Sequence, residues 1–133
     1  YNIYIYYIMN NIDKIHVYLF LFLIILPYIL KRKQIKKYGI YFSIFMTIVI
    51  IGWLFNNGMC ILTNKNQKVK YKYGLTPAFF NEYFNVSLEN LKNISKILEI
   101  LYGISAYILA SSNKLLQKTI IIIVLANLFI NYK

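Results

Sequence analysis

The sequence of 133 residues is 59% hydrophobic and only 14% charged, with a formal net charge of +11 at pH 7. Soluble domains average about 25% charged residues, so this composition excludes a water-facing surface for the whole chain. The length fits one domain. The fifteen Lys and Arg residues lie between apolar runs, and no basic-aromatic motif of a nucleic-acid-binding module occurs. We therefore expect anionic lipid headgroups, and not nucleic acid, as their partners.

Two apolar runs in the first half of the chain predict a pair of membrane-spanning helices. The run 15–30 would measure about 24 Å as a helix, which is short for a hydrocarbon core of about 30 Å. The second run, 38–62, follows the segment KRKQIKK, which holds five positive charges in seven residues. A loop this short predicts antiparallel helices, and its charge predicts a cytoplasmic position. Its basic residues are the predicted headgroup contacts: Lys31, Arg32, Lys33, Lys36 and Lys37.

The runs 96–112 and 115–131 predict a second pair of spans with a tight connection between them. Within the third span, small residues at helical spacing predict the close approach of another helix: Gly103, Ala106 and Ala110. The predicted fold is thus all-α, a single membrane domain with four transmembrane helices arranged as two helical hairpins. Loops 31–37 and 111–118 should lie on one side of the membrane, the loop 63–93 on the other, and both termini together.

A polar stretch, 63–93, separates the two pairs. Thr76 and Pro77 predict the start of a short helix over 78–84, which we expect to lie on the membrane surface because aromatic residues gather on one of its sides. The segment 1–12 is rich in Tyr and Ile and too short to span. It predicts either an interfacial segment or a strand added to a partner.

Glu99 is the clearest candidate for a functional side chain. An acid inside a predicted span is energetically costly and indicates function, although Lys96 lies three residues earlier and could pair with it. His16 begins the first span and could carry a proton, bind a metal or mark the membrane boundary. The predicted topology places His16 and Glu99 near the same membrane face. The remaining candidates are amides that could either join helices or line a conduction path: Asn56, Asn57 and Asn127.

The sequence offers little for catalysis, so we do not expect an enzyme. The chain has four Asp and Glu residues, one His and one Cys in all. A cysteine nucleophile needs a positioned base, and Cys60 has no evident one. No catalytic triad, phosphate loop or dinucleotide fingerprint occurs. We expect no cofactor and no metal site; a lipid-modifying enzyme with a metal at His16 and Cys60 is the weakest of the functions considered.

The segment 53–63, WLFNNGMCILT, is the most specific local pattern. It resembles the W-L-x-N-N-x-x-C-x-L-T segment of uncharacterised small membrane proteins of giant DNA viruses. More loosely, the chain is similar to a bacterial family of small four-span proteins with a His on the first helix and C-P-L-T after the second. His16 and Cys60–Thr63 are the matching positions, with Ile61 in place of the Pro. The resemblance implies a four-helix membrane fold and no assigned reaction.

These observations predict a non-catalytic structural or accessory subunit of a larger membrane assembly, in a mitochondrial or other organellar inner membrane or a viral or host membrane. Its predicted partner contacts are Trp53, Cys60, Phe79 and Phe80. The alternative is a small oligomeric channel or proton-coupled transporter that uses Glu99, His16 and Asn127. A wet cavity shared by Glu99 and Asn127 would favour transport, whereas pairing of Glu99 with Lys96 or a lipid headgroup would favour the subunit.

Overall fold

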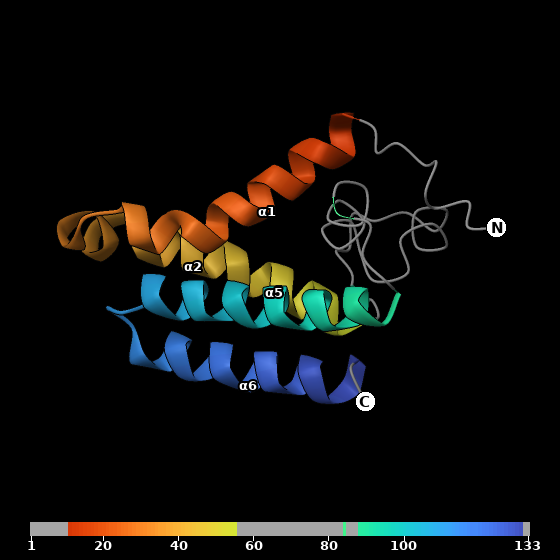
Figure 1. The fold of residues 1–133 in the computed structure, drawn as a ribbon. Coiled ribbons are helices and arrows are strands. Elements are labelled where there is room, and N and C mark those ends of the chain that lie inside the picture. Colours follow the sequence, from red (N-terminus) through yellow and green to blue (C-terminus); the bar gives the residue numbers. More distant parts are fainter. Residues whose placement is uncertain (1–10, 56–83, 85–87, 132–133) are drawn as a thin grey trace.

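The computed structural model describes residues 11–55, 84 and 88–131, and these ranges are almost entirely helical (Figure 1). The long helices are α1 (Asn11–Ile29), α2 (Arg32–Phe55), α5 (Leu88–Leu109) and α6 (Lys114–Asn131). No strand occurs in the described ranges, which confirms the predicted all-α class. The predicted surface helix over 78–84 lies outside the described residues, apart from Phe84.

Helix boundaries differ from the predicted ones because polar segments continue the helices. The basic segment 31–37 is not a loop, since α2 begins at Arg32. The Lys31 backbone N–H donates to Oε1 of Gln34 (2.9 Å), a capping interaction that closes the first turn, and Lys, Arg and Gln are good helix formers. In the same way α5 begins at Leu88, inside the stretch predicted as a polar loop. Glu99 therefore lies near the middle of its helix.

The connection between α5 and α6 is as tight as predicted. Asn113 caps α6, because its Oδ1 accepts a hydrogen bond from the Leu116 backbone N–H (3.1 Å). The Gln117 side chain donates from Nε2 to the carbonyl oxygen of Tyr107 (3.1 Å), which joins the two helices beside the turn. Both short turns lie at one end of the bundle, whereas α1 begins and α6 ends at the other (Figure 1).

Helix α5 is the centre of the bundle, because it packs against α1, α2 and α6. It forms an antiparallel hairpin with α6, as predicted. The predicted first hairpin is different: α1 and α2 are joined by a tight turn, but α1 packs mainly against α5. The Ser105 hydroxyl of α5 donates to the carbonyl oxygen of Ile24 in α1 (2.5 Å). Toward its N-terminus α1 diverges from the other helices (Figure 1).

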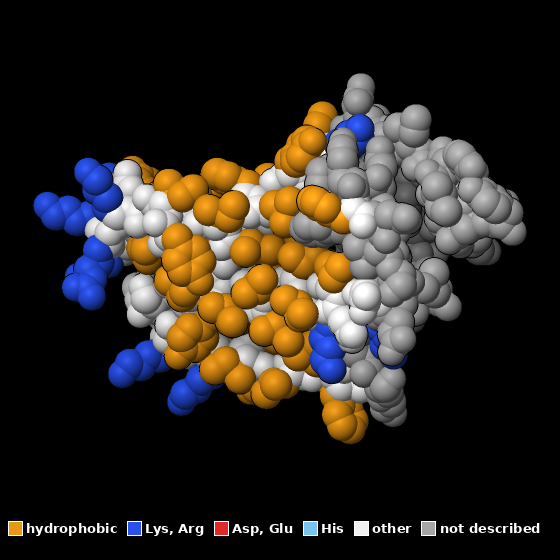
Figure 2. Space-filling view, in the orientation of Figure 1, with side chains coloured by type: hydrophobic (Ala, Val, Ile, Leu, Met, Phe, Trp, Pro, Cys, Tyr) orange, Lys and Arg blue, Asp and Glu red, His pale blue; other side chains and the backbone are white. Residues whose placement is uncertain are grey.

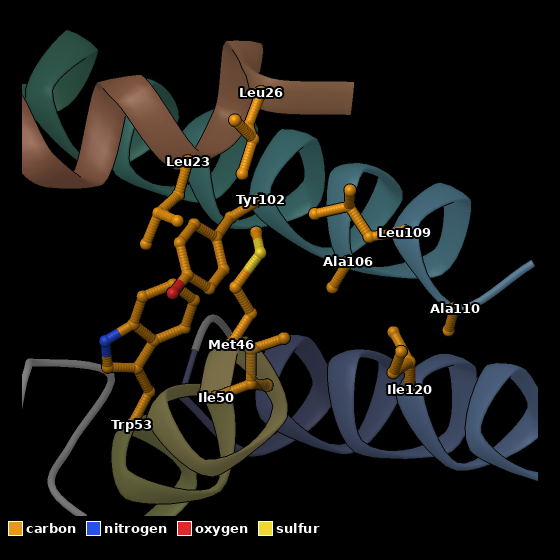
Figure 3. Close-up of a cluster of buried hydrophobic side chains, with 10 residues drawn as sticks. All are labelled: Leu23, Leu26, Met46, Ile50, Trp53, Tyr102, Ala106, Leu109, Ala110 and Ile120. Carbon is orange, nitrogen blue, oxygen red and sulfur yellow. The ribbon is translucent and has the colours of Figure 1, made fainter. Parts of the chain in front are cut away.

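An aromatic group links three of the helices. The rings of Phe20 (α1) and Tyr102 (α5) are stacked with centroids 5.0 Å apart, and Trp53 (α2) lies 4.9 Å from Tyr102 and 5.8 Å from Phe20. Figure 3 shows Tyr102 and Trp53 beside Met46 within the buried core. Trp53 is buried among the chain's own helices, and the contacts that the structure gives it are with Phe20 and Tyr102; its contact with a partner stays a prediction. Its spacing from Met46 and Ile50 places it on the buried stripe of α2.

Small residues set the distance between α5 and its neighbours. A Cβ atom at Gly39 (α2) would lie 2.5 Å from the carbonyl oxygen of Leu109, and one at Gly103 would lie 2.7 Å from Cγ2 of Val124 (α6). Ala106 is fully buried, and its carbonyl oxygen accepts a hydrogen bond from the Ser43 hydroxyl of α2 (2.9 Å). The small-residue stripe predicted on α5 is thus a packing surface.

We expect Gly39→Ala to destabilise the bundle by about 1–3 kcal/mol, the usual cost of overpacking. The new methyl group would meet a backbone oxygen, which moves only if α2 and α5 separate. Gly103→Ala is the comparison: its methyl group would meet Cγ2 of Val124 at 2.7 Å, a branched side chain that is stiff in a helix, and its cost should be smaller only because no backbone atom is in the way. Thermal unfolding of both variants in detergent checks this, and an equal loss for the two glycines would contradict it.

Candidate functional site

A buried carboxylate lies between α5 and α6, toward the end of the bundle opposite the short turns. Glu99 is 6% exposed and Asn127 is 1% exposed. The Asn127 amide donates from Nδ2 to Oε2 of Glu99 (2.6 Å), and the Asn131 amide donates from Nδ2 to Oδ1 of Asn127 (2.6 Å). These three residues, which we call the acid–amide ladder, lead from the half-exposed last residue of α6 to a buried acid.

The structure brings together two residues that the sequence singled out separately, Glu99 and Asn127. Lys96, the alternative partner of Glu99, is exposed, whereas the Glu99 carboxylate is buried against α6. Asn131 was not predicted, because it ends the last apolar run and resembled a boundary residue. The sequence feature that could have identified Asn131 is its four-residue spacing from Asn127, which places the two amides on one face of a helix.

His16 lies half-buried on α1. Phe20 stacks on Tyr102 and Ser105 bonds to Ile24, so residue numbers rise together along α1 and α5. The two helices therefore run parallel with a fixed register. His16 lies one turn before Phe20, in the part of α1 that diverges from the other helices (Figure 1), so its position beside Glu99 stays a prediction.

Exposed large hydrophobic side chains occur on all four helices, and Figure 2 shows those that cover one face of the bundle. Two helices, α2 and α6, are long and apolar enough to cross a membrane by length and composition. Only 33% of the apolar window of α2 and 11% of that of α6 are buried in the protein. The core helix of a soluble protein would be mostly buried, so these low values favour lipid as the surrounding medium. Of the other two described helices, α1 is apolar but shorter than this length, and α5 does not combine the required length and hydropathy.

Lys and Arg side chains gather at the end that holds both short turns (Figure 2). We call this region, residues 27–39 and 108–120, the basic end; it contains no Asp or Glu. Its seven basic residues are all exposed: Lys31, Arg32, Lys33, Lys36, Lys37, Lys114 and Lys118. Tyr28 and Tyr107 are exposed close to the turns, and the Lys37 ammonium lies 5.2 Å from the ring centroid of Tyr38. Tyrosine beside basic residues is typical of a membrane–water boundary.

The remaining predicted site residues lie outside the part of the chain that the structure describes: Asn56, Asn57, Cys60, Phe79 and Phe80. Comparison of the chain with protein-family models, curated proteins and solved structures gives no match. The similarity of segment 53–63 to viral and bacterial membrane proteins therefore stays a prediction, and function has to be argued from the geometry of the described helices.

Proposed function

We propose that the protein is a four-span integral membrane protein that acts as a non-catalytic structural or accessory subunit of a larger membrane assembly. The observation that supports this most is the apolar lateral surface, to which all four helices contribute. At about 1.5 Å per residue, α1 and α5 have total lengths of about 28 and 33 Å, close to a hydrocarbon core of about 30 Å, although charged residues occupy part of both helices.

The charges of α5 are compatible with a membrane position. Lys92 and Lys96 lie in the first half of the helix, where long lysine side chains can extend toward the membrane surface. Glu99 is buried against α6 and bonded to Asn127, so its carboxylate is shielded from lipid. An acid held in this way is compatible with a span, whereas a lipid-facing one would be very costly.

The role of a subunit follows from what the described bundle offers. Side chains fill its interior, with Tyr102, Met46 and Ile50 among the largest that are fully buried. Its outer surface is broad and apolar, and can meet lipid or the helices of other subunits. The basic end is oriented toward the cytoplasmic or equivalent side, where positive residues are enriched.

The two parts of this proposal can be tested separately. We expect the chain to stay with membranes during extraction in alkaline carbonate and to be released by detergent. When the membranes in which the protein naturally resides are solubilised in mild detergent and separated by native electrophoresis, the chain should migrate in a particle much larger than its own 15.8 kDa. Release by carbonate would contradict the membrane position. A monomer or pure homo-oligomer would contradict the role of subunit.

A proton-coupled channel or transporter is the second candidate, and the acid–amide ladder is the observation that favours it. A buried carboxylate with amides leading to the end of α6 is an arrangement through which protons could move. In proteoliposomes, a transporter should lose proton flux in Glu99→Gln and keep it in Lys96→Gln, which alters an exposed charge on the same helix. Absent flux, or flux that Glu99→Gln leaves unchanged, would leave the subunit as the only candidate.

A further inference from the structure

We propose that the basic end binds a phospholipid headgroup that carries two or more phosphates at different depths, held between the first turns of α2 and the first turns of α6. The inference rests on the proposed membrane position and adds to it a defined ligand class. It also adds Lys114 and Lys118, which the sequence placed on the same side of the membrane as the segment 31–37 but not among the predicted headgroup contacts.

Packing holds the two basic groups at one end of the molecule. The close contact of Gly39, two turns into α2, with the Leu109 carbonyl oxygen fixes this part of α2 against the last turn of α5. The capped turn at 110–113 then leads directly to Lys114. Basic residues from both helices must therefore face the same layer of headgroups.

The basic residues lie at two depths. Helix α2 begins seven residues before Gly39, so its start lies about 10 Å beyond the level of Leu109. Figure 1 shows the start of α2 extending past the end of α5. Lys114 lies close to that level, at the start of α6. A headgroup with phosphates at two depths could meet both groups at once, which a headgroup with a single phosphate could not.

Repulsion within the basic end favours a bound anion. Like charges four residues apart on a helix repel one another, and three such pairs occur here: Arg32 with Lys36, Lys33 with Lys37, and Lys114 with Lys118. The basic end contains no acid of its own to offset them. A phosphate placed between the members of a pair would convert repulsion into attraction. The arrangement is thus suited to a ligand with several negative charges.

The test is lipid retention by the purified full chain, measured by native mass spectrometry after exchange into phosphatidylcholine with one added lipid. The added lipids are phosphatidylinositol bisphosphate, whose diester and ring phosphates lie at different depths, cardiolipin, whose two phosphates lie at one depth, and phosphatidylserine, which carries one phosphate. We expect selective retention of phosphatidylinositol bisphosphate. The double variant Lys114→Gln/Lys118→Gln should weaken it about 30-fold, since each basic residue near an anionic surface adds about fivefold to affinity.

The matched control is Lys92→Gln/Lys96→Gln, which removes two charges from α5 outside the basic end and should leave retention unchanged. Equal retention of phosphatidylserine or cardiolipin, an equal loss in the control, or displacement by soluble pyrophosphate at the same phosphate concentration would each overturn the proposal. Carbonate extraction of the same variants tests the membrane position separately from the headgroup site. Wild-type chain that stays in membranes without lipid selectivity contradicts only the headgroup site.

Discussion

Trp53→Ala is expected to lower the free energy of unfolding by about 3 kcal/mol, the lower part of the range for removing a buried Trp side chain. The lower part of the range applies because lipid or detergent solvates the helices in the unfolded state as well. The substitution therefore removes packing contacts but little of the free energy of transfer from water. Trp53 contacts both Phe20 and Tyr102, so its removal loosens the junction of α1, α2 and α5. Unfolding in mixed micelles of mild detergent and dodecyl sulfate measures the change.

The control for this substitution lies two residues away on the same helix. Phe55 is 83% exposed, and Phe55→Ala should change stability by less than about 0.5 kcal/mol, as surface substitutions usually do. Trp53→Phe should recover part of the loss, because a smaller ring still packs against Tyr102. A Trp53→Ala variant as stable as the wild type would mean that Trp53 does not pack among the chain's own helices.

Asn127→Leu is expected to destabilise the bundle by about 2–3 kcal/mol, because it leaves the buried Glu99 carboxylate without its amide donor. Removing both polar groups should cost less, since two apolar side chains of similar size can replace a buried hydrogen-bonded pair almost neutrally. The variant Glu99→Leu/Asn127→Leu should therefore be more stable than Asn127→Leu alone. A double-mutant cycle in the same micelles gives the coupling energy.

Asn131→Leu is the matched control for the ladder. Asn131 is half-exposed at the end of α6 and donates to another neutral amide, so its replacement should cost about 1 kcal/mol or less. Additive effects of Glu99→Leu and Asn127→Leu, with no coupling between them, would contradict the hydrogen bond between the two side chains.

Apolar runs were sufficient to predict the helices, because membrane-length hydrophobic segments stand out in any sequence. Their starts were misplaced, because Gln34 caps α2 and basic residues continue it, which hydropathy does not register. Glu99 could be found because an acid is rare in an apolar run. Its bond to Asn127 could not be found, because it depends on how α5 and α6 are aligned along their axes.

Trp53 illustrates a different difficulty. Its place in the specific segment 53–63 led us to predict contact with a partner, whereas the structure places it with Met46 and Ile50 on the buried side of α2. Helical spacing would have indicated this side, because the face on which a helical residue lies is set by geometry, whereas a rare local pattern has no fixed orientation.

The most direct measurement of a four-span membrane fold is the reactivity of single cysteines toward a water-soluble maleimide in nanodiscs, where both membrane faces meet water. In a Cys60→Ser background, one cysteine is placed at Ser112, exposed in the α5–α6 turn, or at one of four exposed apolar positions, one on each helix: Ile25, Ile48, Ile104 and Ile122. We expect rapid labelling at position 112 and almost none at the other four, since lipid and not water covers those side chains. Rapid labelling at the position on any one helix would show that this helix does not lie in the membrane. Rapid labelling on all four helices would show that the bundle is exposed to water and would contradict the membrane fold.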